Sequence, residues 1–291
     1  MTFAGAHTAL VTPFRDGQFD TQAFRQLIEE QIAGGISGII PVGTTGESPT
    51  LDHDEHLKVI EVAIQAANKR CLVIAGTGSN STAEAISLTQ AAEKAGADAA
   101  LLVAPYYNKP SQEGLYRHFK AIAEAVKIPL VLYSIPGRCG IEIGVETTAR
   151  LARDFKNIVA IKEAGGSVER VNQLVNALPA GFEILSGDDS LTLPFLSVGA
   201  VGVISVASNI IPAEVSSMVR HYLAGESSKA LSIHKKYYPL FKDLFIEPNP
   251  VPAKFALARL GKMTSDVRLP LCEMTPANTQ RLTETLSRLG L

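Results

Sequence analysis

Eight short apolar segments alternate with helical segments along this chain, and this alternation restricts the fold more than any other feature. The apolar segments cover residues 6–11, 38–42, 71–75, 99–104, 130–133, 158–162, 182–185 and 201–205. Most are apolar throughout rather than at every second position, as expected of strands buried on both faces of a parallel sheet. Helical patterns follow them at residues 21–33, 52–67, from 81, 112–126, 146–153, 168–177, in a short segment before 201, and from 212.

This order predicts an α/β protein, a (β/α)8 TIM barrel formed by residues 1–224. An open doubly wound sheet is the alternative, but it usually carries a Gly-rich loop after its first strand, and here Thr12-Pro13-Phe14 stands at that place. From residue 225 the pattern changes to helices only, at 227–245, 252–260 and 276–289. We expect residues 225–291 to form a C-terminal helical appendage packed on the barrel or on another subunit, because no flexible linker precedes it.

Composition excludes several classes of function. The net charge is −2, so no strong field favours nucleic acid or a membrane surface. The first residues lack a signal-peptide pattern, and no apolar run is long enough to span a bilayer. The 3 cysteines are scattered and show neither a disulfide framework nor a metal-ligand spacing. These features predict a cytoplasmic protein without a metal site.

In a barrel of this kind the active site lies at the C-terminal ends of the strands. Those ends carry one amine, one guanidinium and several hydroxyls, on Thr44, Thr45, Tyr106, Tyr107, Tyr133, Arg138, Lys162 and Ser186. A lysine buried at a strand end loses its charge more easily and can form a Schiff base with a carbonyl. Considered alone, Lys162 is more simply a lysine paired with a carboxylate, but the hydroxyls around it favour imine chemistry, with Tyr133 as a proton carrier.

The neighbouring residues allow two readings each. Thr44 and Thr45 form either an ordinary turn or a carboxylate site, and Arg138 is either a solvated loop residue or a bidentate partner for a second carboxylate. Asp188 and Asp189 repel phosphate and are interpreted as N-caps of the next helix.

Several motifs together resemble the dihydrodipicolinate synthase family of pyruvate aldolases, to which N-acetylneuraminate lyase also belongs. They are Gly43-Thr44-Thr45-Gly46-Glu47, Pro105-Tyr106-Tyr107-Asn108-Lys109-Pro110, the stretch 133–140, and Ile161-Lys162-Glu163-Ala164. The resemblance covers the whole chain. It implies condensation of pyruvate with L-aspartate 4-semialdehyde to 4-hydroxy-tetrahydrodipicolinate, in L-lysine and diaminopimelate biosynthesis. No metal or organic cofactor is implied. The alternative is another lyase of the family, acting on N-acetylneuraminate or 2-keto-3-deoxygluconate.

The same resemblance implies a role for each site residue. Lys162 forms the Schiff base, Tyr133 donates and accepts the proton, and Thr44 links Tyr133 to Tyr107 of a neighbouring subunit. Thr45 is implied to hold the carboxylate of pyruvate, and the main chain of Ile204 is implied to line the pyruvate site. Gly187 is a further substrate-binding residue, and Arg138 is implied to bind the carboxylate of L-aspartate 4-semialdehyde. Ser134 and Cys139 depart from the family pattern beside Arg138.

Feedback inhibition by L-lysine and a homotetramer built as a dimer of dimers are also implied. The inhibitor site would contain two imidazoles, an amide, a carboxylate and adjacent loop residues, namely Ser48, Pro49, His53, His56, Asn80, Glu84 and Tyr106. Without the resemblance these are solvated helix histidines, a helix cap and a helix-start glutamate.

Overall fold

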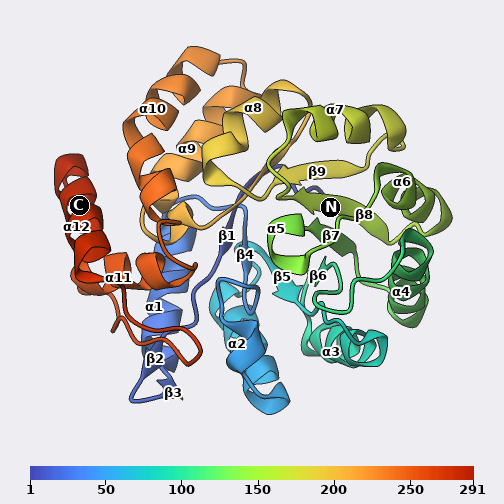
Figure 1. Cartoon of the computed structure of the whole chain (residues 1–291), viewed down its shortest axis with the longest axis horizontal. Coiled ribbons are helices and arrows are strands. Elements are labelled where there is room, and N and C mark those ends of the chain that lie inside the picture. The colour runs from blue at the N-terminus through green and yellow to red at the C-terminus, as the bar shows by residue number, and fades with distance from the viewer.

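The computed structural model describes residues 1–291 and contains a closed barrel of eight parallel strands (Figure 1). Every strand pairs with its neighbour in the chain, and the first strand also pairs with the last, which closes the barrel. The predicted fold class is therefore confirmed. The barrel strands are β1 (Gly5–Ala9), β4 (Gly38–Ile40), β5 (Leu72–Gly76), β6 (Ala99–Val103), β7 (Leu130–Ser134), β8 (Ile158–Glu163), β9 (Glu183–Ser186) and β10 (Gly202–Ser205).

A ring of helices surrounds the barrel, and short polar residues start several of them. Asp20, Asp52, Ser81, Ser111 and Ser167 each accept a hydrogen bond from a backbone N–H of the first helical turn. The helices are α1 (Thr21–Ala33), α2 (His53–Ala67), α3 (Thr82–Ala95), α4 (Gln112–Ala125), α6 (Val145–Asp154), α7 (Val168–Ala177), α8 (Thr192–Ser197) and α9 (Pro212–Leu223).

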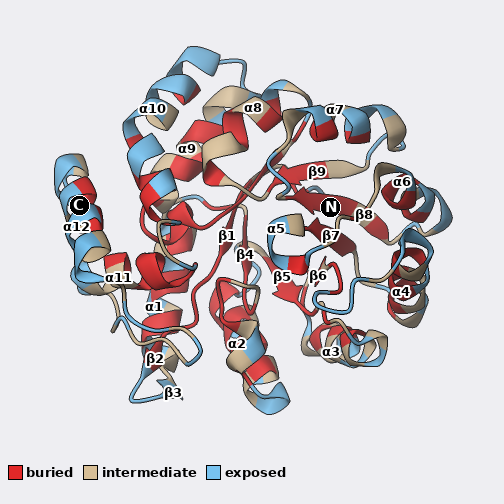
Figure 2. Ribbon diagram, viewed as in Figure 1, coloured by how far each residue is buried: buried red, intermediate tan, exposed pale blue.

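The strands are buried on both faces (Figure 2). Residues such as Ile40, Leu101 and Ile204 fill the barrel interior, while two larger apolar clusters lie between the barrel and its helices. Burial on both faces explains why the strand segments are apolar without alternation.

The predicted C-terminal helices are present as α10 (Ser227–Asp243), α11 (Val251–Arg259) and α12 (Pro276–Leu289). They lie on one side of the barrel, where α10 contacts α9 (Figure 1). Leu240, Leu257 and Leu282 from these helices belong to the same apolar cluster as Ile28 of α1 and Val59 of α2. This shared core gives the C-terminal region a fixed position against the barrel. The domain boundary at residue 224 stays a prediction.

Some local structure differs from the sequence prediction. The second strand ends at Ile40, two residues before the predicted end, because Val42 has a φ of 53°, outside the range of a strand. A hairpin of β2 (Phe14–Arg15) and β3 (Gln18–Phe19) and the short helix α5 (Pro136–Cys139) were not predicted. Three 3-10 turns, η1 (Ser48–Thr50), η2 (Asp189–Leu191) and η3 (Ala207–Asn209), complete the fold. None of the helices has the length and apolar character needed to cross a membrane.

Candidate active site

Lys162 lies near the end of β8, with its side chain inside the barrel and only 6% exposed. The parallel register places Lys162 beside Tyr133 of β7. The Lys162 Nζ atom lies 4.1 Å from the centre of the Tyr133 ring. Unlike the amine of Lys254, which pairs with Glu47, this amine forms no ion pair within the chain. The structure thus brings together the amine and the phenol that the sequence singled out.

The pKa of Lys162 is lowered to about 7 by burial and by the charge of Arg138, against the charge of Asp189, which raises it. Burial is the largest cause, because an ammonium loses its hydration inside the barrel. At neutral pH a large share of this amine is therefore uncharged. An uncharged amine has the lone pair that nucleophilic attack on a carbonyl requires.

Tyr133 has the opposite perturbation. Burial raises the pKa of its phenol to about 12, although Arg138 and a hydrogen bond with Thr44 both lower it. The phenol therefore carries its proton at neutral pH. It can donate that proton to an oxygen or nitrogen near Lys162 and recover it afterwards.

The loop that carries Thr44 and Thr45 is held in an unusual backbone conformation. Val42 and Glu47, at its two ends, have φ angles of 53° and 55°. A β-branched residue rarely adopts a positive φ, so Val42 is strained. Two glycines pack against it, because a Cβ on Gly46 or Gly76 would lie 2.9 Å or 2.5 Å from Val42 backbone atoms. Strained backbone enforced by close packing is a common property of functional sites.

Thr44 and Thr45 have different surroundings. Thr44 lines a cavity of about 240 Å³, whereas Thr45 is only 4% exposed and is not part of its lining. The Thr45 hydroxyl accepts a hydrogen bond of 2.9 Å from the side-chain amide of Asn249, in the C-terminal region. The sequence analysis did not identify Asn249, since no local pattern connects it with a residue 204 positions earlier.

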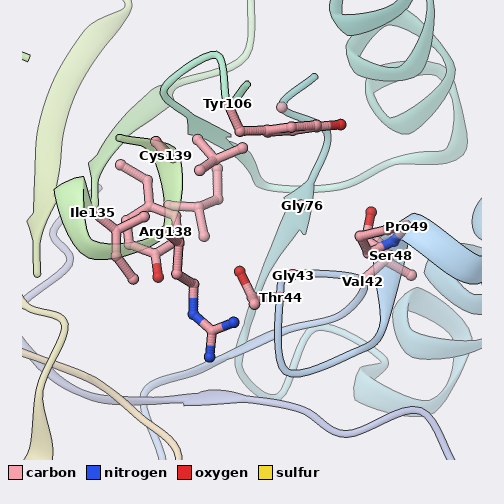
Figure 3. A pocket seen from close by; sticks show the side chains of 14 residues that line it. Val42, Gly43, Thr44, Ser48, Pro49, Gly76, Tyr106, Ile135, Arg138 and Cys139 are labelled. Atoms are coloured by element: carbon pink, nitrogen blue, oxygen red, sulfur yellow. The ribbon is translucent and has the colours of Figure 1, made fainter. Parts of the chain in front are cut away.

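The cavity is lined by residues of β7, α5 and the loop after β4, including Tyr133, Arg138 and Thr44. Figure 3 shows the side chains of Arg138 and Thr44 among those that line the cavity. Ser48, Pro49 and Tyr106 line the same cavity. Residues of the expected substrate site and of the expected inhibitor site thus share one cavity.

The two residues that depart from the family pattern are both buried and hydrogen-bonded. The Ser134 hydroxyl accepts from the backbone N–H of Ile143 at 3.3 Å, and the Cys139 thiol donates to the carbonyl of Ala104 at 3.2 Å. Cys139 also lines the cavity beside Arg138. Their hydrogen bonds hold the Arg138 loop in place.

Gly187 directly follows β9 and lies beside Lys162, whereas Ile204 lies within β10. A Cβ on Gly187 would lie 3.1 Å from Lys162 Cε and 2.6 Å from Ala164 Cβ, so the position has no room for a side chain. Ile204 is 1% exposed and belongs to the barrel interior together with Tyr133.

The interpretation of the two aspartates was right for one of them. Asp188 caps η2 and accepts from the backbone N–H groups of Ser190 and Leu191. Asp189 is not a cap: it is buried, and its Oδ2 accepts from the N–H groups of Val206 and Ala207, each at 3.0 Å. Burial raises the pKa of Asp189 despite these bonds. The charge of its carboxyl group raises the pKa of Lys162.

The residues expected at the inhibitor site are close together but unequal in exposure. His53 Nε2 lies 2.8 Å from Glu84 Oε1, and the Asn80 amide donates to the carbonyl of Tyr106 at 3.2 Å. His56 is buried, and its Nε2 donates to the carbonyl of Gly76 at 2.9 Å. His56 is thus held against β5, near enough to His53 and Glu84 for their charges to act on its pKa, and the inhibitor site as a whole stays a prediction.

Tyr107 is 90% exposed and has a φ of 71°. It does not line the cavity of its own subunit, although its neighbour Tyr106 does. The chain also has no group of three or more His, Cys, Asp or Glu side chains arranged to hold a metal ion.

Comparison with known proteins gives a consistent result. The model of the "Dihydrodipicolinate synthetase family" matches residues 2–289. The chain is 54% identical over 289 residues to the 4-hydroxy-tetrahydrodipicolinate synthase of Syntrophus aciditrophicus (strain SB), covering 99% of both chains. It is 57% identical to the solved 4-hydroxy-tetrahydrodipicolinate synthase of Methylacidiphilum fumariolicum SolV, with a TM-score of 0.98 and coverage of 99% and 96%.

A solved dihydrodipicolinate synthase from Cyanidioschyzon merolae, with lysine bound, is 44% identical with a TM-score of 0.97 and 99% coverage of both chains. Sequence and structure agree over nearly the full length of these proteins. This chain therefore belongs to the dihydrodipicolinate synthetase family, a family of lyase-type enzymes.

Proposed function

We propose that this protein is a 4-hydroxy-tetrahydrodipicolinate synthase, which condenses pyruvate with L-aspartate 4-semialdehyde. The observation that carries the proposal is the buried amine of Lys162, with a pKa of about 7, beside the protonated phenol of Tyr133. The names of relatives that are 54% and 57% identical support the same activity. The reaction belongs to L-lysine and diaminopimelate biosynthesis, and we infer a cytoplasmic location.

The chemistry follows from these two groups. The uncharged Lys162 amine attacks the ketone carbon of pyruvate. One proton passes from the amine to the ketone oxygen, Tyr133 donates a second, and the oxygen leaves as water. The resulting iminium withdraws electrons from the adjacent methyl group, which loses a proton to give an enamine. The enamine carbon attacks the aldehyde of the second substrate. The amino group of that substrate then attacks the iminium carbon, which closes the ring and releases Lys162.

The other site residues hold the substrates. We assign the pyruvate carboxylate to Thr45 and the main chain near Ile204, while Gly187 leaves space beside Lys162. Arg138, at the cavity, is placed to form a bidentate pair with the carboxylate of L-aspartate 4-semialdehyde. Because Lys162 itself accepts the electrons as an iminium, the reaction needs no further cofactor.

The proton path includes a second subunit. Tyr107 is almost fully exposed and does not line the cavity of its own subunit, so we infer that it reaches the site of a neighbouring subunit. There it would hydrogen-bond to Thr44, which already contacts Tyr133. We propose a homotetramer built as a dimer of dimers, in which each close pair of subunits exchanges this tyrosine.

We also propose that L-lysine inhibits the enzyme at the part of the cavity formed by Ser48, Pro49 and Tyr106, with His53, His56, Asn80 and Glu84 beside it. The lysine-bound state of a relative that is 44% identical supports this assignment. Glu84 carries a lowered pKa through hydrogen bonds from Ser79 and His53, so it is ionised and attracts an ammonium group. His56 contributes indirectly, because its hydrogen bond fixes the carbonyl group of Gly76.

The alternative activity is cleavage of a sugar acid such as N-acetylneuraminate or 2-keto-3-deoxygluconate. Arg138 argues against it, because a guanidinium at the cavity suits a short carboxylated aldehyde better than a polyol chain.

The test has two parts. A coupled assay compares condensation with L-aspartate 4-semialdehyde against cleavage of the two sugar acids. Borohydride reduction in the presence of pyruvate should add the mass of the reduced adduct to the Lys162 peptide, and Lys254, the other buried lysine, serves as an internal control. Faster cleavage of a sugar acid, or labelling of a peptide other than that of Lys162, would reject the proposal.

Inhibition is tested separately by initial rates at increasing L-lysine. Glu84→Thr should weaken inhibition while leaving condensation intact. Full sensitivity of this variant would place the inhibitor elsewhere.

A further inference from the structure

We propose that Asn249, in the C-terminal region, is a positioning residue that fixes the Thr45 hydroxyl as a hydrogen-bond donor toward the carboxylate of pyruvate. The inference rests on the proposed function and assigns a role to a residue outside the strands and loops of the barrel. Its basis is a buried contact between segments 204 residues apart.

The contact is short and shielded from water. Asn249 Nδ2 lies 2.9 Å from Thr45 Oγ1, and the two residues are 6% and 4% exposed. Asn249 lies two residues before the start of α11, and Thr45 lies in the strained loop after β4. A hydrogen bond between two side chains in such surroundings restricts both rotamers.

The direction of this hydrogen bond determines what Thr45 can do. An amide nitrogen has two protons and no accessible lone pair, so the threonine hydroxyl must accept. A hydroxyl has one proton only, and that proton remains free for another acceptor. A carboxylate is an acceptor on both oxygens. Asn249 thus sets the polarity of Thr45 so that its proton is available to the substrate.

Asn249 also has an atom without a partner. Its Oδ1 is buried and forms no hydrogen bond within the chain. An asparagine that served packing alone would be replaced at no loss by an apolar residue, because a buried carbonyl without a hydrogen bond destabilises the fold. Unsatisfied polar atoms in a native structure call for an explanation. The donor function of the same amide explains why the polar group is present.

The same region fixes the other end of the loop. The Lys254 ammonium lies 2.5 Å from Glu47 Oε1, with both side chains at most 1% exposed, and it donates to the carbonyl of Asp266 at 2.7 Å. Glu47 Oε2 accepts from the backbone N–H of Arg268 at 3.0 Å. With the backbone anchored at Glu47, Asn249 has only the Thr45 side chain to orient.

The experiment measures the pyruvate concentration that gives half-maximal borohydride labelling of Lys162, in Asn249→Ala, Asn249→Asp and Asn249→Ser. Aspartate is closest to asparagine in shape, but it only accepts, so it would take the Thr45 proton away from the substrate. We expect Asn249→Asp to raise the half-saturating concentration on the order of tenfold or more, and more than Asn249→Ala does. Asn249→Ser retains a hydrogen-bond donor, so its half-saturating pyruvate concentration should be nearest to that of the parent.

If Asn249 served packing alone, Asn249→Ala should have a larger effect than Asn249→Asp, because alanine leaves a cavity and aspartate does not. The added negative charge is controlled by repeating Asn249→Asp in a Thr45→Val background, where we expect its effect on half-saturation to disappear. An equal effect in both backgrounds, or a smaller effect than that of Asn249→Ala, would overturn the inference.

Circular dichroism melting of each variant separates loss of fold from loss of pyruvate affinity. A folded Asn249→Asp with the parent's half-saturation would reject the role of Asn249 and leave the proposed function standing. Absence of pyruvate labelling in the parent itself would reject both.

Discussion

The chain contains two lysines in its interior, Lys162 and Lys254, and we expect their replacement by methionine to have opposite effects on stability. Lys162 has no ion-pair partner, whereas Lys254 is paired with Glu47. Lys162→Met removes an amine that the fold holds at a cost. Lys254→Met removes one member of a buried pair and leaves the carboxylate of Glu47 without a counter-ion.

The magnitude for Lys162 follows from its pKa of about 7, against an ordinary value of 10.5. The folded protein binds fewer protons here than the unfolded chain between these two pH values, so the amine destabilises the fold increasingly as pH falls through that window. At pH 7 this cost is about 4 kcal/mol. Lys162→Met should therefore raise the melting temperature by roughly 5–10 °C at pH 7. Part of that gain should be lost at pH 9.

For Lys254→Met we expect a loss of roughly 3–5 kcal/mol. The pKa of Lys254 is lowered to about 8, chiefly by burial, but Glu47 raises it and thereby recovers part of the cost. The double variant Lys254→Met with Glu47→Gln should recover much of the loss.

Thermal unfolding followed by far-ultraviolet circular dichroism checks both variants under one protocol. Tyrosine fluorescence gives a second probe, since the chain has 7 tyrosines and no tryptophan. A Lys162→Met protein that is less stable than the parent at pH 7 would refute the reasoning. So would a gain that is equally large at pH 7 and pH 9, because the gain would then have no link to the amine's protonation.

Three further expectations follow. Pyruvate labelling of Lys162 should rise with pH and reach half its maximum near pH 7. Arg138→Gln should move that midpoint to higher pH, because the charge of Arg138 lowers the pKa of Lys162. A midpoint near pH 10 in the parent would contradict the low pKa of this amine. Burial lowers the pKa of His118 to about 4, so the folded state resists protonation of this imidazole. The free energy of unfolding should therefore fall by up to about 3 kcal/mol between pH 6.5 and pH 4. The His118→Gln variant should show a smaller fall in melting temperature over that range. Tyr107→Phe should slow condensation at least tenfold while pyruvate labelling persists, and an unchanged rate would exclude a shared proton path.

Most of the fold could be read from the sequence, because eight apolar segments and the helices between them obey local rules of periodicity and capping. The start of α2 after Asp52 and the whole of α1 are examples. The early end of β4 could not be predicted, since Val42 is forced into a positive φ by contacts with Gly46 and with Gly76 of another strand. That conformation results from packing and leaves no local trace.

The site residues on strand ends, Lys162 and Tyr133, could be selected because topology alone brings such ends together. Asp189 and Asn249 could not be selected. Asp189 looks like a helix cap until the loop after β10 supplies the N–H groups that bind it. Asn249 can be recognised only through its contact with Thr45, which lies 204 residues earlier in the chain. Contacts between distant segments depend on the assembled fold.

Closure of the barrel has a consequence during synthesis of the chain. One edge of β1 pairs with β4, but the other edge stays unpaired until β10 is synthesised, because Gly202 of β10 pairs with Gly5 of β1. At ribosomal rates of about 5–20 residues per second, that edge stays open for roughly 10–40 seconds. During this interval the nascent chain exposes a strand edge that can recruit foreign strands. Asn249 emerges later still. A nascent chain released early would therefore be prone to aggregate and would lack a completed site.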